Sequence, residues 1–186
     1  MVLLVDAQTH FLEMMHGAQE PVLARMERLV RFAELLDLPV VVTLEHPVEQ
    51  KGGLPERLES ALPETATYFV KTSFDCMAEE PIRKALDRPC VAVAGGETDV
   101  CILQSVLALL DAGHRVFLLE DCLFSSEPDV GPALRRMEAA GAMPATFKSF
   151  AYEITAKVEA AWPAKWRERL AQRPELFPPP EDLPRA

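Results

Sequence analysis

The sequence has no apolar run that could cross a membrane, and it has little positive charge. A membrane-spanning helix needs about 20 consecutive apolar residues, and the apolar runs of this 186-residue chain are far shorter. Lys and Arg number 19 against 29 Asp and Glu, which gives a formal net charge of −10. This balance argues against nucleic-acid and membrane partners, although a small anionic substrate could still bind in a local basic pocket.

Targeting signals and paired metal-ligand cysteines are also absent from the sequence. The N-terminal MVLLV reaches Asp6 without a basic start, so we expect no signal peptide and a cytoplasmic protein. The four cysteines form no CxxC pair and no zinc spacing. They are Cys76, Cys90, Cys101 and Cys122. In a reducing compartment they are free thiols, so each one is explained either by packing or by chemistry.

Short apolar segments alternate with segments of helical periodicity along most of the chain. The apolar segments predict strands at 1–6, 38–44, 67–70, 90–94, 116–119 and 142–146. The periodic segments predict helices at 20–36, 54–61, 79–87, 100–112, 128–140, 150–160 and 163–171. This alternation is typical of parallel strands joined by right-handed crossovers, and it predicts a three-layer α/β/α sandwich with a mainly parallel, Rossmann-like sheet. We expect one domain over residues 1–172 and a proline-rich tail without regular structure over 173–186.

Reactive side chains follow three of the predicted strands, where ligands bind in sheets of this kind. Asp6 closes the first strand, Lys71 closes the third, and Cys101 opens the helix after the fourth. A carboxylate can accept a thiol proton, and an ammonium and a helix N-terminus are both expected to lower the pKa of a cysteine. Backbone N–H groups at that terminus can bind an oxyanion.

Each of these residues also has a purely structural explanation. A cysteine at the start of an apolar helix is often a core residue, an Asp at a strand end often caps a turn, and a Lys there is usually solvated. Their shared edge of the sheet, together with the Gly95–Gly96 break before Cys101, favours the catalytic interpretation.

These motifs resemble the isochorismatase-like cysteine hydrolases, which include nicotinamidases and N-carbamoylsarcosine amidase. The resemblance covers roughly residues 1–156 and is carried by VLLVDAQ at 2–8, VKTSF at 70–74, AGGETDVCILQS at 94–105 and GHRVFLLEDC at 113–122. Within the family, TLEHPVEQKGG, KTSFDC and the Glu97 before the cysteine are most similar to the small isochorismatase-domain-containing proteins.

The resemblance implies a role for each residue of the predicted site. Cys101 is the nucleophile, Asp6 the general base and Lys71 the third member of the triad. A non-proline cis peptide falls at Gly96–Glu97, and the N–H groups of Glu97 and Cys101 form the oxyanion hole. The implied sheet order is 3-2-1-4-5-6, so Lys71 lies on an edge strand and has to reach inward.

The same resemblance bears on metals, the pocket and assembly. Nicotinamidases hold a metal through an Asp-x-His pair after the second strand, but Glu45-His46-Pro47 has the wrong spacing, so no metal and no other cofactor is expected. Residues Gln8, Phe11, His46 and Phe74 are candidates for the pocket wall, and core packing is an equal alternative for Phe11, His46 and Phe74. Family members generally form homo-oligomers, which we also expect for this chain.

The sequence therefore predicts a hydrolase that cleaves a C–N bond of a small molecule through a cysteine thioester. Two alternatives remain open at this stage. One is a thiol redox protein that pairs Cys101 with Cys76 or Cys122, and the other is a non-catalytic binding protein in an oligomer.

Overall fold

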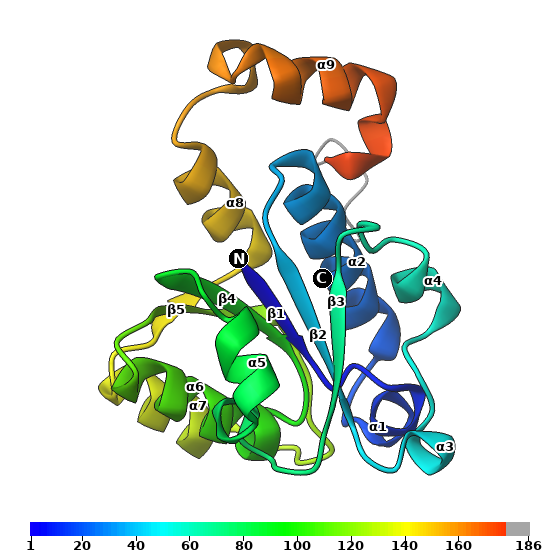
Figure 1. Ribbon diagram of the computed structural model, residues 1–186, viewed down its shortest axis with the longest axis vertical. Coiled ribbons are helices and arrows are strands. Elements are labelled where there is room, and N and C mark those ends of the chain that lie inside the picture. Colours follow the sequence, from blue (N-terminus) through cyan, green and yellow to red (C-terminus); the bar gives the residue numbers. More distant parts are fainter. Residues whose placement is uncertain (178–186) are drawn as a thin grey trace.

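A six-stranded parallel sheet forms the centre of the molecule, in the order β3-β2-β1-β4-β5-β6 (Figure 1). The structure, a computed structural model, describes residues 1–177. The strands are β1 (Val2–Val5), β2 (Val40–Glu45), β3 (Thr67–Lys71), β4 (Cys90–Gly95), β5 (Arg115–Leu123) and β6 (Met143–Ala145). The predicted α/β class and the predicted order of the strands are both confirmed.

Helices cover both faces of the sheet. They are α1 (Thr9–Met14), α2 (Gln19–Leu35), α3 (Val48–Lys51), α4 (Glu56–Glu59), α5 (Glu80–Ala85), α6 (Leu103–Asp111), α7 (Gly131–Ala139), α8 (Phe147–Thr155) and α9 (Ala164–Gln172). The sequence did not predict α1 and α3, because six and four residues are too few to show helical periodicity. No helix among residues 1–177 is long and apolar enough to span a membrane.

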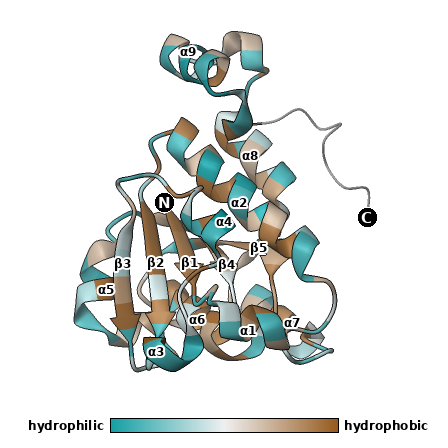
Figure 2. Ribbon diagram, turned by 90° about the vertical axis from the view of Figure 1, so that its right-hand side faces the viewer, coloured by the Kyte–Doolittle hydropathy of each residue, from teal (hydrophilic) through white to brown (hydrophobic). Residues whose placement is uncertain are grey.

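The strands alternate their side chains between two hydrophobic cores, one on each face of the sheet. Figure 2 shows that the strands are largely hydrophobic and that helices surround them. On one face, Val2 and Leu4 pack with α2 and α8; on the other, Leu3 and Val5 pack with α5, α6 and α7. All four residues of β1 are completely buried. A parallel sheet buried on both faces needs such continuously apolar strands, which is why the sequence VLLV predicts a strand.

The edge strand β3 differs from the central strands in its exposure. Tyr68 and Val70 are 43% and 56% exposed, whereas Lys71 at the end of the strand is fully buried. The strand pairs on one side with β2, where Lys71 lies opposite Glu45. Lys71 is thus the one fully buried residue of this strand, and the partly buried Phe69 packs against the core on one face of the sheet.

The segment after α9 is more ordered than its proline content predicted. Pro174–Leu176 forms a turn of 3₁₀ helix, and Leu176 is completely buried. The Phe177 ring lies 5.5 Å from the ring of Phe32 in α2. The prediction of an irregular tail from 173 is therefore wrong for these residues, because two apolar side chains anchor them to the core. The rest of the predicted tail, 178–186, lies outside the described residues.

Leu176→Ala is expected to lower the free energy of unfolding by about 2–3 kcal/mol, because it removes a buried side chain and leaves a cavity. Urea unfolding monitored by circular dichroism measures this difference. Val158→Ala is the matched control, since Val158 is 74% exposed and its loss should change stability by no more than about 0.5 kcal/mol. Equal effects from the two variants would contradict the anchoring role.

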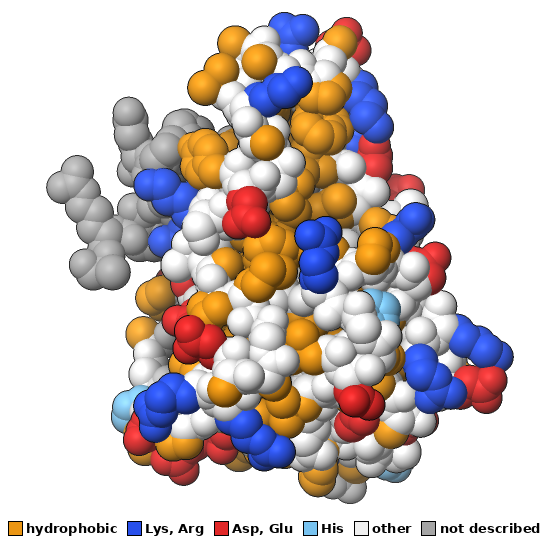
Figure 3. Space-filling view, turned by 90° about the vertical axis from the view of Figure 1, so that its left-hand side faces the viewer, with side chains coloured by type: hydrophobic (Ala, Val, Ile, Leu, Met, Phe, Trp, Pro, Cys, Tyr) orange, Lys and Arg blue, Asp and Glu red, His pale blue; other side chains and the backbone are white. Residues whose placement is uncertain are grey.

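Hydrophobic side chains also gather on part of the surface. On the side of the molecule that carries α8 and the β5 end of the sheet, they form an elongated band (Figure 3). Tyr152 in α8 and Val158 after it are large hydrophobic residues that are 47% and 74% exposed. Extended apolar areas of this kind are common at protein–protein interfaces.

Candidate active site

The carboxyl ends of four adjacent strands bring ionisable groups to one place. Asp6 follows β1, Glu45 ends β2, Lys71 ends β3, and Cys101 lies in the π-helical turn Thr98–Ile102 that follows β4. These strands are neighbours in the sheet, and the ends of β2 and β3 lie near α3 in Figures 1 and 2. The structure therefore brings together the three residues that the sequence placed at this edge.

A buried ion pair lies at the centre of the site. Lys71 Nζ is 2.7 Å from Asp6 Oδ2, and both side chains are completely buried. Lys71 also donates a hydrogen bond to the Ser73 carbonyl at 3.0 Å, and Thr43 Oγ1 donates to Asp6 Oδ1 at 2.9 Å. Asp6 has a φ of 44°, a left-handed conformation that Asp adopts more readily than most residues. Both carboxylate oxygens of Asp6 are thus engaged inside the protein.

The Cys101 thiol lies directly against this pair. Its Sγ is 3.5 Å from Lys71 Nζ, and it donates to Glu45 Oε2 at 3.3 Å. An oxygen of Asp6 lies within 4.8 Å of the sulfur. Only 2% of Cys101 is exposed to solvent.

Glu45 is the site residue that sequence reasoning missed. It was considered only as a departure from a metal-binding motif, although it ends a buried strand in the same way as Asp6 and Lys71. Its Oε1 accepts a hydrogen bond from Lys51 Nζ, and its Oε2 lies 3.7 Å from Lys71 Nζ. The strand-end rule that identified the other residues, applied to β2 as well, would have identified it.

The pKa of Cys101 is shifted upward, opposite to the direction that the sequence predicted. Burial is the largest cause, and the negative charge of Asp6 comes next. The Lys71 ammonium lowers this pKa as expected, but it does not outweigh burial and the nearby carboxylates. The raised pKa indicates that Cys101 is a neutral thiol in the free protein.

The raised pKa of Cys101 predicts the pH at which its thiolate appears in the free protein. The ultraviolet absorbance difference between wild type and Cys101→Ala should show no thiolate step until the pH is well above 9.0, the ordinary pKa of a cysteine. The same difference measured on urea-unfolded chains should titrate near 9.0, because unfolding removes the burial. A step at neutral pH in the folded protein would contradict the assignment of a neutral thiol.

The pKa values of the two carboxyl groups beside the thiol are shifted in opposite directions. Burial raises the pKa of Asp6, and the opposing effects of Lys71 and Thr43 do not cancel this increase. Burial also acts to raise the pKa of Glu45, but the hydrogen bond from Lys51 and the neighbouring charges lower it overall. Burial acts to lower the pKa of Lys71, but the charge of Asp6, the nearby thiols and the hydrogen bond to Asp6 together raise it overall, so the ammonium is retained. Asp6 is therefore the better proton acceptor of the two carboxylates.

The backbone before Cys101 has an unusual conformation. The Gly96–Glu97 peptide bond is cis. Gly95 has a φ of 111°, and a Cβ there would lie 1.9 Å from the Val5 carbonyl oxygen, so only glycine fits. The N–H groups of Val100 and Ile102 both donate to the Glu97 carbonyl, at 3.2 and 3.0 Å. These bonds hold the turn that carries Cys101 against the end of β4.

The four predicted pocket residues lie in different environments. Gln8 is completely buried, and its amide bonds the Gly52 carbonyl at 2.8 Å and both backbone groups of Glu45. Phe11 is 9% exposed and packs in the core, whereas Phe74 is 50% exposed. His46 is exposed. Gln8 thus contacts the site only through the backbone of Glu45, and Phe11 is a core residue.

Asp6, Glu45 and Cys101 could in principle ligate a metal ion, since one donor atom of each lies within 4.8 Å of the other two. The Lys71 ammonium, however, lies 2.7, 3.7 and 3.5 Å from these same three groups. A fixed positive charge at that position repels a cation. The donor set therefore fits an ion pair with Lys71 better than it fits a metal.

Two of the remaining thiols bond to groups outside the buried ion pair: Cys76 Sγ to Thr43 Oγ1 at 3.9 Å and Cys122 Sγ to Asp121 Oδ1 at 3.7 Å. All four cysteines lie in the described part of the chain and are free. Cys76 and Cys122 are completely buried, and burial raises the pKa of Cys76 to about 11. Burial likewise raises the pKa of Cys122 well above its ordinary range.

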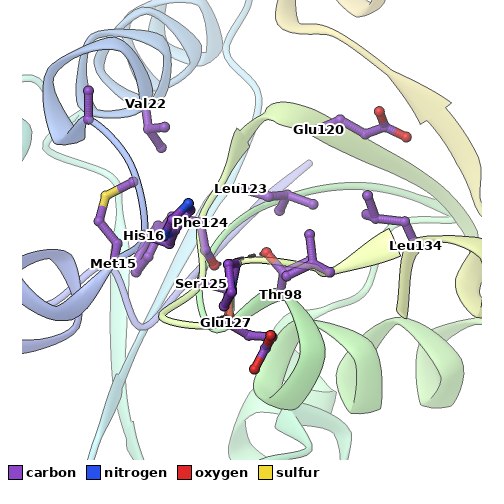
Figure 4. Close-up of a pocket in the computed structure, with 13 residues that line it drawn as sticks. Met15, His16, Val22, Thr98, Glu120, Leu123, Phe124, Ser125, Glu127 and Leu134 are labelled. Atoms are coloured by element: carbon purple, nitrogen blue, oxygen red, sulfur yellow. Dashed lines mark hydrogen bonds between the residues drawn. The ribbon is translucent and has the colours of Figure 1, made fainter. Parts of the chain in front are cut away.

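A separate cavity of about 270 Å³ lies beyond the turn of Cys101 (Figure 4). Thr98, Phe124 and Ser125 line it together with His16, and Thr98 Oγ1 donates to the Phe124 carbonyl at 2.8 Å. Residues that contact the Cys101 thiol are absent from its described lining. This cavity is therefore distinct from the space in front of the thiol.

Comparison with curated proteins gives relatives of one kind. Isochorismatase domain-containing protein 2 of Bos taurus is 30% identical over 159 residues, which are 83% of this chain and 74% of that protein. The protein of the same name from Xenopus laevis is 34% identical over 119 residues, and the alignment spans 62% of this chain and 56% of that protein's length.

Solved structures agree with this fold. The structure described as MAR1 ribonuclease from Caenorhabditis elegans superposes with a TM-score of 0.82 at 25% identity, covering 100% of this chain and 94% of that one. The YcaC gene product from Escherichia coli, described as an octameric hydrolase of unknown specificity, gives 0.81 at 25% identity and covers 95% and 85%. A family model for the isochorismatase domain matches residues 1–149. The chain therefore belongs to the isochorismatase family.

Proposed function

We propose that this protein is a cysteine hydrolase that cleaves a C–N bond of a small molecule. The observation that carries the proposal is the buried Lys71–Asp6 ion pair in contact with the Cys101 thiol. Burying two charges is unfavourable unless they are well paired, so a buried pair beside a reactive atom favours a functional explanation. Membership of the isochorismatase family supports a hydrolase.

The proposed reaction forms and hydrolyses a thioester. Cys101 Sγ bonds to the carbonyl carbon, the thiol proton passes to Asp6, and the carbonyl electrons move to the oxygen. The tetrahedral intermediate collapses, the C–N bond breaks, and Asp6 returns the proton to the leaving nitrogen. Water then attacks the thioester carbon through Asp6, and the S–C bond breaks to give a carboxylic acid and the free thiol.

Each remaining group has a part in this proposal. Lys71 offsets the negative charge that develops on Sγ, which lies 3.5 Å away. The backbone N–H groups of Glu97 and Cys101 are assigned to the oxyanion, on the basis of their place in the turn before and at the nucleophile. Raised pKa values of Asp6 and Cys101 fit a proton transfer that occurs during attack rather than before it.

The two alternative functions have less support. A redox pair of Cys101 with Cys76 or Cys122 would need a second thiol that an oxidant can reach, and both candidates are completely buried. A purely binding role leaves the buried ion pair without an explanation. The ribonuclease activity named for the Caenorhabditis elegans neighbour is not proposed, because a net charge of −10 disfavours binding of RNA.

A homo-oligomer is also proposed. The hydrophobic band over α8 and the β5 end of the sheet (Figure 3) provides an apolar surface of the kind that subunits bury. The octamer described for the Escherichia coli neighbour supports assembly into an oligomer. Size-exclusion chromatography with light scattering tests it directly.

The experiment that tests the function combines turnover with detection of the intermediate. A panel of small amides, ureas and carbamoyl compounds is screened for release of ammonia or amine, and acid-quenched samples are examined by intact-mass and peptide-level mass spectrometry. The proposal expects turnover of at least one compound and an acyl adduct on the peptide that contains Cys101. A folded protein with neither turnover nor adduct across the panel would favour the binding role.

A further inference from the structure

Glu45 is the only carboxylate of the site, within the described residues, that combines contact with the thiol and access to solvent. Its Oε2 accepts the hydrogen bond from Cys101 Sγ at 3.3 Å, and its side chain is 12% exposed. Asp6 is completely buried and bonded by Lys71 and Thr43. An incoming molecule therefore meets the Glu45 carboxylate and the sulfur together, whereas Asp6 lies behind them.

Hydrogen bonds hold both the backbone and the side chain of Glu45 in this position. The buried amide of Gln8 accepts from the Glu45 N–H at 2.6 Å and donates to the Glu45 carbonyl at 3.3 Å. Lys51 Nζ bonds Oε1 and also donates to the His46 carbonyl at 2.8 Å. This arrangement leaves Oε2 directed toward Sγ. The predicted pocket residue Gln8 thus acts through Glu45 as a positioning residue.

The charge at this position has a consequence for the substrate. A carboxylate that has lost its proton repels an anion held a few ångströms away, and the repulsion is strong where water is partly excluded. It also accepts hydrogen bonds but has no hydrogen to donate. A neutral or cationic molecule with an N–H beside its carbonyl satisfies both conditions, whereas a molecule that bears a carboxylate fails the first of them.

We propose that Glu45 is a specificity-determining residue that accepts an N–H hydrogen bond from the substrate and excludes anionic substrates from the Cys101 thiol. The substrate class is then a neutral or cationic carbonyl compound with an N–H next to the carbonyl, such as a primary amide or a urea. This inference rests on the proposed function, since it assumes that Cys101 reacts with substrates.

Two thiol reagents of nearly equal size test the proposal without knowledge of the substrate. Iodoacetamide is neutral and carries N–H groups, whereas iodoacetate is an anion; each forms an S–C bond with Cys101 and releases iodide. The rates at the Cys101 peptide are followed by mass spectrometry, and the ratio of the iodoacetamide rate to the iodoacetate rate is compared between variants. The ratio cancels changes in the fraction of thiolate, which affect both rates equally.

Glu45→Gln is expected to lower this ratio about ten-fold, because it removes one negative charge close to the reacting sulfur. Glu45→Asp keeps the charge and should retain most of the wild-type ratio. Glu49→Gln is the matched control, since it removes the same charge from an exposed position on α3. Lys51→Gln should raise the ratio, because it removes a positive charge bonded to Glu45. High salt should reduce the wild-type ratio through screening.

The outcomes separate this inference from the proposed function. If Cys101 is labelled but Glu45→Gln leaves the ratio at the wild-type value, the specificity role of Glu45 is refuted and the hydrolase proposal stands. If Glu49→Gln lowers the ratio as much as Glu45→Gln does, the effect belongs to general surface charge and the inference is also refuted. If neither reagent labels Cys101 in the folded protein, an accessible nucleophile is refuted and both proposals fall.

Discussion

Lys71→Met is expected to lower the free energy of unfolding by about 3–5 kcal/mol at neutral pH, because it leaves a buried carboxylate without its partner. Lys71 and Asp6 are both completely buried, and their charged atoms are 2.7 Å apart. Thr43 keeps its hydrogen bond to Asp6 Oδ1 in the variant, but a hydroxyl does not neutralise the charge. Chemical unfolding of wild type and variant at matched pH measures the difference.

The loss should depend on pH in a defined direction. Burial raises the pKa of Asp6 above its ordinary value of 3.8, and Lys71 opposes this increase, so the pKa of Asp6 rises further in the variant. A carboxyl whose pKa is higher in the folded state contributes stability at low pH and loses it as the pH rises through the folded-state value. The deficit of Lys71→Met should therefore be small near pH 3.8 and grow toward neutral pH.

Two further variants show whether the ion pair is the cause. Asp6→Asn combined with Lys71→Met removes both charges and should recover a substantial part of the lost stability. Lys165→Met is the control, since it breaks an ion pair with Asp37 in which the lysine side chain is 63% exposed, and it should cost no more than about 1 kcal/mol. A pH-independent deficit, or no recovery in the double variant, would contradict the account.

Cys101→Ala is expected to lower kcat at least about 10³-fold on any compound that the wild type turns over, because the nucleophile is lost. The effect on folding should be small, since a buried thiol is replaced by a slightly smaller apolar side chain. Measurement of kcat and of the unfolding midpoint on the same preparation separates the two effects. The acyl adduct should disappear from the mass spectrum together with the turnover.

Cys122→Ala serves as the matched control for loss of a buried thiol. Cys122 is as buried as Cys101, but it lies in β5 and its sulfur contacts Asp121 rather than the proposed site. Its replacement should therefore leave kcat close to the wild-type value. Retained activity in Cys101→Ala, or equal losses in both variants, would refute the assignment of the nucleophile.

The strand-end residues could be predicted from the sequence because topology alone brings them together. In a parallel sheet the carboxyl ends of neighbouring strands share one edge, so Asp6, Lys71 and Cys101 converge whatever the details of the loops. Lys71 reaches Asp6 across the width of β2, as its place on an edge strand required. The same rule applies to Glu45, which ends β2, so this residue was also predictable from the sequence.

Quantities that depend on three-dimensional packing could not be predicted in the same way. Burial and the negative charge of Asp6 raise the pKa of Cys101, and the Lys71 ammonium lowers it. Which effect is larger depends on distances and burial in the folded protein, which the sequence does not contain. Phe11 and Phe74 both follow strand ends in the sequence, yet one is 9% exposed and the other 50%. In the tail, Leu176 and Phe177 pack on the core despite the prolines around them.

The edge position of β3 has a dynamic consequence for the site. This strand has hydrogen-bonded partners on one side only and carries Lys71 at its end. Edge elements with exposed side chains open locally at a lower free energy than the rest of a domain. Each local opening of β3 withdraws the ammonium from Asp6 and Cys101 while the sheet centre stays folded. Under the proposed function, a molecule is not competent while β3 is open, and any contact that covers β3 makes such openings rarer.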